Sequence, residues 1–218
     1  NYIFGQMWNG LAAILYPGSE FMEGDAVIAE TVFTKSGRGR TSDFLNYYRV
    51  AFDNGDYRKW GHWRFVSQRD YMPNHYALGY LCLGGIRYLH GSPTLMGDAL
   101  QISARNPLKL SSVYDKIEEA SGKKFQDAFM EVCDTLGKIW KAEADSRAPY
   151  IPREQVTPEP KLYTDYSSVI FAGDGMYAVK NGFVHTPTLV RISTKKKEKF
   201  LAYMSPQSSE LRADAEGG

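Results

Sequence analysis

SEFMEGDAVIAETVFT, residues 19–34, is the stretch that indicates a helical protein. Ser19 has the short hydroxyl side chain of an N-cap, and Glu20 follows in the first turn, where the helix dipole favours negative charge. Apolar residues then recur at helical spacing, namely Met22, Ala26 and Ala29. Together these features predict a helix that begins at Ser19.

Five later segments also have the pattern of helices, and they cover residues 41–54, 73–90, 94–105, 111–120 and 123–144. Thr41 is the expected cap of the first of these, and Trp60, His62 and Trp63 lie in an expected loop after it. The last segment carries a core-facing stripe of Phe125, Phe129, Val132, Leu136, Ile139 and Trp140. Glycines inside residues 73–90 indicate close approach by another helix or by a ligand.

The pattern changes after residue 148. Four prolines break residues 149–162, which must therefore run extended. Four short β-type runs follow, at residues 168–172, 176–180, 188–192 and 199–203. We therefore predict a mostly α fold with a short C-terminal β segment: a helical domain over residues 1–148, a linker over 149–162, and a β-strand tail over 163–218.

Composition excludes some classes of function. The net charge is +1, from 26 basic and 25 acidic residues, so the chain lacks the basic footprint of a nucleic-acid binder. No stretch approaches the ~18–20 apolar residues that cross a bilayer. The only two cysteines, Cys82 and Cys133, lie within helical patterns and are expected as buried free thiols, unless their two helices touch and allow a disulfide.

The acidic residues of the opening helix are the first candidates for chemistry. Glu23 and Glu30 are seven residues apart, so they share one helix face two turns apart. Gly24 and Ala26 leave room for something to approach the carboxylate of Glu23. The alternative interpretation is a solvated acidic face beside a contact between small residues.

The run Glu-Gly-x-Ala-x-x-x-Glu, formed by Glu23, Gly24, Ala26 and Glu30, resembles the third-ligand helix of gluzincin-type (peptidase-MA-like) zinc metallopeptidases. The resemblance extends through residues 75–80 and 121–125 and covers about residues 1–145. It implies that Glu23 is the third zinc ligand and that Glu30 lies in the second shell of the metal. It also implies a peptide or protein substrate and, by family habit, an extracytoplasmic location in a bacterium.

The same resemblance also implies which residues would donate hydrogen bonds to an oxyanion. Related peptidases use a downstream tyrosine to donate a hydrogen bond to the tetrahedral oxyanion, and Tyr76 or Tyr80 would fill that role here, with His75 as a neighbouring donor. The alternative is that both tyrosines are packing residues of an apolar helix.

One departure from the family decides what the chain can do by itself. The zinc-binding HExxH motif is absent, and none of the four histidines has another at i+4. If the resemblance holds, the HExxH helix is expected to precede Asn1, and zinc binds only in the complete parent domain. This chain alone is then expected to hold no zinc and to be inactive.

The alternative to a peptidase fragment is a non-catalytic helical scaffold or interaction domain attached to a β-propeller. The tail beyond Tyr163 resembles the start of a TolB-like propeller, and its four runs have the spacing of one propeller blade or one sheet of a sandwich. An HExxH motif upstream of Asn1 would favour the peptidase, and its absence would favour the scaffold.

Overall fold

A computed structural model of the chain describes residues 18–65, 67, 69–106, 109–172, 175–205 and 210–212. These residues form two compact units. The first comprises the described residues up to 65 together with Met72–Ala148, and the second comprises Ser67–Tyr71 and the described residues from Pro149 onward. Helices make up the first unit and strands the second, which confirms the predicted mostly α fold with a short C-terminal β segment.

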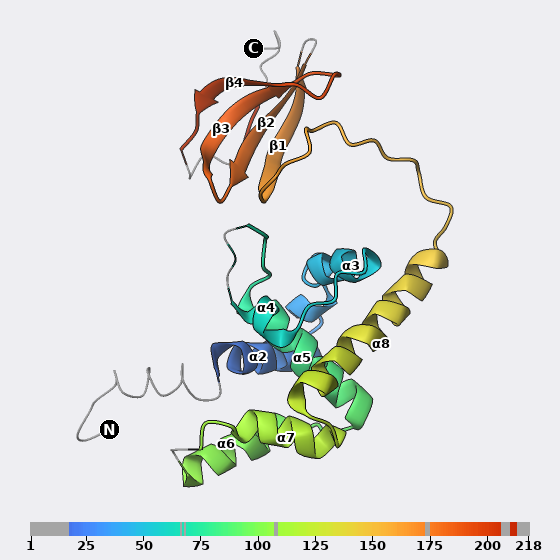
Figure 1. Cartoon of the computed structure of the whole chain (residues 1–218), viewed down its shortest axis with the longest axis vertical. Coiled ribbons are helices and arrows are strands. Elements are labelled where there is room, and N and C mark those ends of the chain that lie inside the picture. The colour runs from blue at the N-terminus through green and yellow to red at the C-terminus, as the bar shows by residue number, and fades with distance from the viewer. Residues whose placement is uncertain are drawn as a thin grey trace, which may run out of the picture. The chain divides into compact units, whose positions relative to one another are not determined.

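The helical unit contains seven α-helices and one 3-10 helix within the described residues (Figure 1): α2 (Ser19–Phe33), η2 (Arg38–Arg40), α3 (Asn46–Asp53), α4 (Trp60–Arg64), α5 (His75–His90), α6 (Leu95–Arg105), α7 (Ser112–Ser121) and α8 (Phe125–Asp145). The residues at the two ends of α5 show why this helix begins and ends where it does. The side chain of Asn74 accepts a hydrogen bond from the backbone N–H of Ala77 at 3.1 Å. At the other end, Gly91 has φ 61°, the left-handed conformation that glycine adopts without strain.

Helix α2 differs in two ways from the prediction. Gly18, not Ser19, occupies the N-cap. The apolar residues Met22, Ala26 and Ala29 lie on the exposed side, whereas the buried side is formed by Glu20, Phe21, Gly24 and Val27. Close packing at Gly24 decides which side faces the core, and side-chain hydrophobicity alone could not reveal it.

The segment after α2 also differs from its prediction. Thr41 ends the 3-10 helix η2 instead of capping a long helix, and α3 begins only at Asn46. The expected loop around the two tryptophans is the short helix α4, in which Trp60 and Trp63 are buried and His62 is exposed. Five residues are too few for helical periodicity to be recognised in a sequence.

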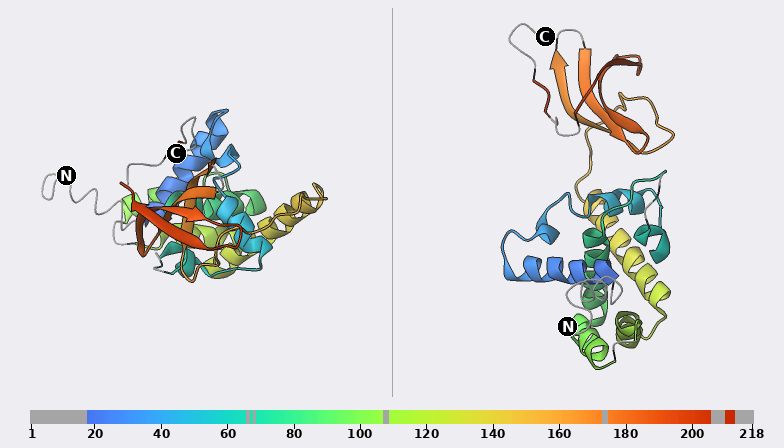
Figure 2. Two further views of the ribbon diagram at one scale, coloured as in Figure 1. Left: turned by 90° about the horizontal axis from the view of Figure 1, so that it is seen from above. Right: turned by 90° about the vertical axis from the view of Figure 1, so that its left-hand side faces the viewer.

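The core of the helical unit is built around α5, which α2 crosses in the right-hand view of Figure 2. Helix α8 packs on α5, and its predicted stripe is confirmed, because Phe129, Val132 and Trp140 are buried and the other members pack against the core. Aromatic rings fill the centre: Trp60 stacks on Phe21 at 5.1 Å and meets Phe129 edge-on at 5.2 Å.

The second unit is one antiparallel sheet in the order β1-β2-β3-β4, with strands β1 (Thr164–Ala172), β2 (Gly175–Gly182), β3 (His185–Ile192) and β4 (Glu198–Tyr203). Each pair of neighbouring strands contains one register shift. A small apolar cluster of Ala178, Val190 and Ile192 lies on one face. Residues 149–163 precede β1 without helix or strand, and the N–H of Tyr163 donates to the carbonyl oxygen of Arg69 at 3.0 Å.

Candidate functional site

The crossing of α2 and α5 positions the candidate residues. A Cβ atom added at Gly24 would overlap the backbone of Gly79, and one added at Gly79 would overlap the carbonyl oxygen of Glu20. The two backbones are therefore in direct contact, which only glycine permits. The expectation that a glycine of this segment marks close approach by another helix is confirmed at Gly79. The crossing brings the tyrosines of α5 beside the acidic helix α2.

Helix α2 carries four carboxylates, and three of them pair with arginines: Glu20 with Arg64 at 2.7 Å, Asp25 with Arg87 at 2.5 Å, and Glu30 with Arg38 at 2.9 Å. The fourth, Glu23, is half-buried and makes no hydrogen bond or ion pair with any described residue. Its carboxylate oxygens therefore keep their lone pairs free for a ligand from outside this part of the chain.

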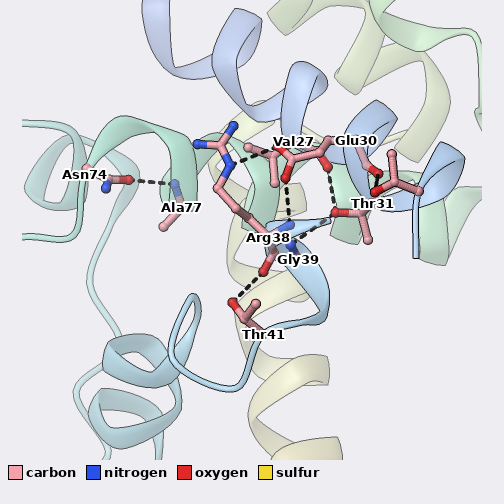
Figure 3. Close-up of polar contacts among 9 residues, drawn as sticks. Val27, Glu30, Thr31, Arg38, Gly39, Thr41, Asn74 and Ala77 are labelled. Atoms are coloured by element: carbon pink, nitrogen blue, oxygen red, sulfur yellow. Dashed lines mark hydrogen bonds and ion pairs between the residues drawn. The ribbon is translucent and has the colours of Figure 1, made fainter. Parts of the chain in front are cut away.

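The second predicted carboxylate, Glu30, anchors the loop after α2 (Figure 3). Its two oxygens accept from the backbone N–H of Arg38 at 3.0 Å and from the guanidinium Nε of Arg38 at 2.9 Å. These bonds to Arg38 hold the pKa of Glu30 below its ordinary value. Thr31 reinforces the same loop, since its hydroxyl accepts from the N–H of Gly39 at 3.1 Å.

The predicted oxyanion donors are in different surroundings. Tyr76 is half-buried, the guanidinium of Arg38 lies 4.9 Å from the centre of its ring, and its hydroxyl makes no hydrogen bond within the described ranges. The imidazole of His75 is exposed, with its ring centre 4.5 Å from that of Tyr76. The Tyr80 ring packs edge-on against Phe44 at 5.6 Å and lies against Gly39, so it holds the loop after α2 against α5.

Arg38 therefore links the two predicted sets of residues. It pairs with Glu30 on α2 and covers the ring of Tyr76 on α5. Arg38 could not be recognised from the sequence, because it and the glycines around it form no known motif. An exposed arginine eight residues after a glutamate, across a helix end, is a weak signal in a sequence.

The ion pair between the buried Glu20 and the partly exposed Arg64 was not predicted either. Glu20 is only 3% exposed, and its partner Arg64 also contacts the hydroxyl of Tyr114 at 3.4 Å. Glu20 lies four residues before Gly24, hence on the same buried side of α2. That spacing was the available clue, but a glutamate in a first helical turn is more simply interpreted as a response to the helix dipole.

The donors present fall short of a zinc site. Hydrolytic zinc needs three protein ligands and an open position for water. No group of three or more His, Cys, Asp and Glu side chains in the described part of the chain is arranged to hold a metal ion. Residues 1–17 contain none of these four residue types. Glu23 can thus supply one ligand, and the described residues supply no others around it.

Both cysteines are buried and unpaired. Burial raises the pKa of Cys133 to about 12 and that of Cys82 well above its ordinary value, so neither has the character of a nucleophile. His90, the last residue of α5, lies 3.2 Å from Glu131, and His185 is exposed at the start of β3.

None of the helices in the described ranges is both long and apolar enough to cross a bilayer.

In comparisons with protein-family models, curated proteins and solved structures, nothing matches this chain.

Proposed function

We propose that the helical unit is the part of a gluzincin-type zinc peptidase domain that supplies the third metal ligand, Glu23. The observation that carries the proposal is the contrast along α2, where arginines pair with three carboxylates and Glu23 has no partner among the described residues. A partly buried carboxylate whose oxygens are not taken by neighbouring arginines has lone pairs available to a cation.

The neighbours of the candidate residues refine this assignment. The room predicted at Gly24 is filled by the backbone of Gly79, so a ligand would have to reach Glu23 from a side that α5 does not cover. Tyr76 and Tyr80 both remain candidates to donate to an oxyanion, because neither hydroxyl is bonded to a described residue; Arg38 lies over the ring of Tyr76, whereas the ring of Tyr80 packs against Phe44. Glu30 then supports the site indirectly, by fixing Arg38 over Tyr76.

On this proposal the substrate is a peptide or protein, and the remaining ligands and the general base belong to an HExxH segment ahead of Asn1. This chain alone supplies one ligand and no general base, so it is expected to hold no zinc and to hydrolyse nothing. A non-catalytic scaffold joined to a propeller is the second candidate, and the incomplete donor set favours it.

The experiment compares Glu23→Gln with Glu119→Gln in the parent protein that includes the preceding segment. Glu119 is an exposed glutamate of α7 and serves as the matched control. We expect stoichiometric zinc and peptidase activity in the parent and the control, and at least tenfold weaker zinc binding in Glu23→Gln, with an unchanged melting temperature. Equal zinc content in the two variants, or no zinc in the parent, would overturn the proposal and leave the scaffold.

A further inference from the structure

The sheet unit contains a hollow of about 310 Å3 between the strands and the extended segment that precedes β1. This volume is at the lower end of the range for small-molecule sites. Polar residues of all four strands line it, namely Thr164 and Tyr166 of β1, Lys180 of β2, His185 of β3 and Glu198 of β4, and three of them, Tyr166, Lys180 and Glu198, contact one another. Side chains that project from strands hold a more fixed geometry than side chains on loops.

These three side chains form one connected group. The Nζ of Lys180 lies 2.6 Å from one oxygen of Glu198, and the hydroxyl of Tyr166 donates to the other. The Lys180 and Glu198 side chains are only 20% and 16% exposed. Burial and the neighbouring carboxylate raise the pKa of Tyr166, so its hydroxyl keeps its proton and remains a donor.

The group has hydrogen-bonding capacity left over. An ammonium has three N–H donors, and one of them is directed at Glu198; each carboxylate oxygen can accept more than one hydrogen bond. A ligand in the hollow therefore meets a donor and an acceptor side by side. A hydroxyl group can accept from Lys180 and donate to Glu198, and two adjacent hydroxyls can do so together.

The charge of the lining limits the class of ligand further. Two acidic residues, Glu159 and Glu198, are balanced by two lysines, Lys161 and Lys180, with His185 of the lining counted as neutral. A balanced lining gives no net attraction to an anion or a cation. The rest of the wall includes apolar surface from Pro160, Leu162 and Val184. Such a wall suits the C–H face of a ring whose hydroxyls project from its edge.

We infer that this hollow is a binding site for a neutral, polyhydroxylated ring, namely one saccharide unit of a glycan. The site lies entirely within the sheet unit, so the inference stands independently of the peptidase proposal. A purely structural role for the three side chains, tying β1 to β4, predicts no response to any ligand.

The test is an NMR titration of the full chain with glucose, galactose, mannose and N-acetylglucosamine, alongside glucuronate and the dipeptide Ala-Pro. At least one neutral sugar should shift the signals of Tyr166, Lys180 and Val184, with a Kd on the order of 1 mM. Glucuronate should bind no better than its neutral counterpart.

Two variants locate the site. Glu198→Gln should weaken sugar binding at least tenfold, and Val184→Asp should do the same at an exposed position where the fold is not at risk. Lys199→Gln, one residue along β4 and outside the lining, is the matched control and should bind as the wild type does. The inference is overturned if no neutral sugar shifts these signals, if the dipeptide alone does so, or if neither variant weakens binding.

Discussion

The carboxylate of Glu20, almost fully buried at the start of α2, lies 2.7 Å from Nε of Arg64 at the end of α4. This pair joins α2 to α4 through two residues that lie 44 positions apart in the chain. A buried carboxylate is tolerated only while its charge is compensated.

Replacing Arg64 by methionine should therefore leave Glu20 without a partner and destabilise the helical unit by about 2 kcal/mol. Urea unfolding measures the change. The double variant Glu20→Gln/Arg64→Met should recover most of the loss, because no uncompensated charge remains. Lys141→Met is the control, since the pair of Lys141 with Asp145 is exposed and worth less than about 0.5 kcal/mol. Equal effects of Arg64→Met and Lys141→Met would show that the buried pair does not stabilise the unit.

The glycines of α2 and α5 permit a sharp comparison. Gly24→Ala places a methyl group into the backbone of Gly79 and should cost about 1–3 kcal/mol. Gly84→Ala, on α5 itself, meets open space and should stabilise the helix by about 0.5–1 kcal/mol, because glycine is the poorer helix former. Thermal unfolding of the two variants should move in opposite directions. A stable Gly24→Ala protein would refute direct contact between the two backbones.

Glu30 makes the loop after α2 sensitive to acid. Its folded-state pKa lies below the ordinary value of 4.5, first because of the backbone hydrogen bond from Arg38 and next because of the Arg38 side chain. Its contribution to stability is therefore complete above about pH 4.5 and is lost as the pH falls through the lower, folded-state pKa. A carboxyl 13C NMR titration should show Glu30 titrating below the exposed glutamates.

Arg38→Gln should move the pKa of Glu30 back towards 4.5, in part only, because the backbone N–H donor remains. The same variant should remove the cation–π contact with Tyr76, which the ring signals of that residue would report. A titration curve of Glu30 identical to that of the wild type would argue against the pairing.

The two cysteines should resist modification while the helical unit is folded. Burial raises the pKa of both thiols, that of Cys133 to about 12, so almost no thiolate forms near pH 8. A thiol reagent such as DTNB should react with neither cysteine in native buffer and with both in denaturant. Rapid reaction of one thiol in the native protein would reveal local opening of α5 or α8.

Much of the fold could be predicted from the sequence because its long elements have strong periodic signals. The stripe along α8, the apolar run of α5 with its terminal glycine, and four strands separated by turns all lie close to their predicted bounds. The buried side of α2 could not be predicted, because packing at Gly24 depends on Gly79, which lies 55 residues later in the chain. Apolar spacing instead pointed to the side that carries Ala26.

The candidate site, too, could be predicted from the sequence only in part. Spacing alone places Glu23 and Glu30 on one face of α2. It could not show that Arg38 takes both oxygens of Glu30, or that Phe44 packs against Tyr80, because these partners come from a loop with no periodic pattern. Partners of this kind are set by tertiary packing, and here they distinguish Glu23 from the other acids of the helix.

The order of the four strands has a consequence for how the chain can be extended. The polypeptide enters the sheet at β1, on one edge, and leaves it at β4, on the opposite edge. Further sheets of the same kind could therefore follow in series, each joined to the last by a short connection that crosses no other. The meander is thus a module that evolution can duplicate in tandem without reordering any strand.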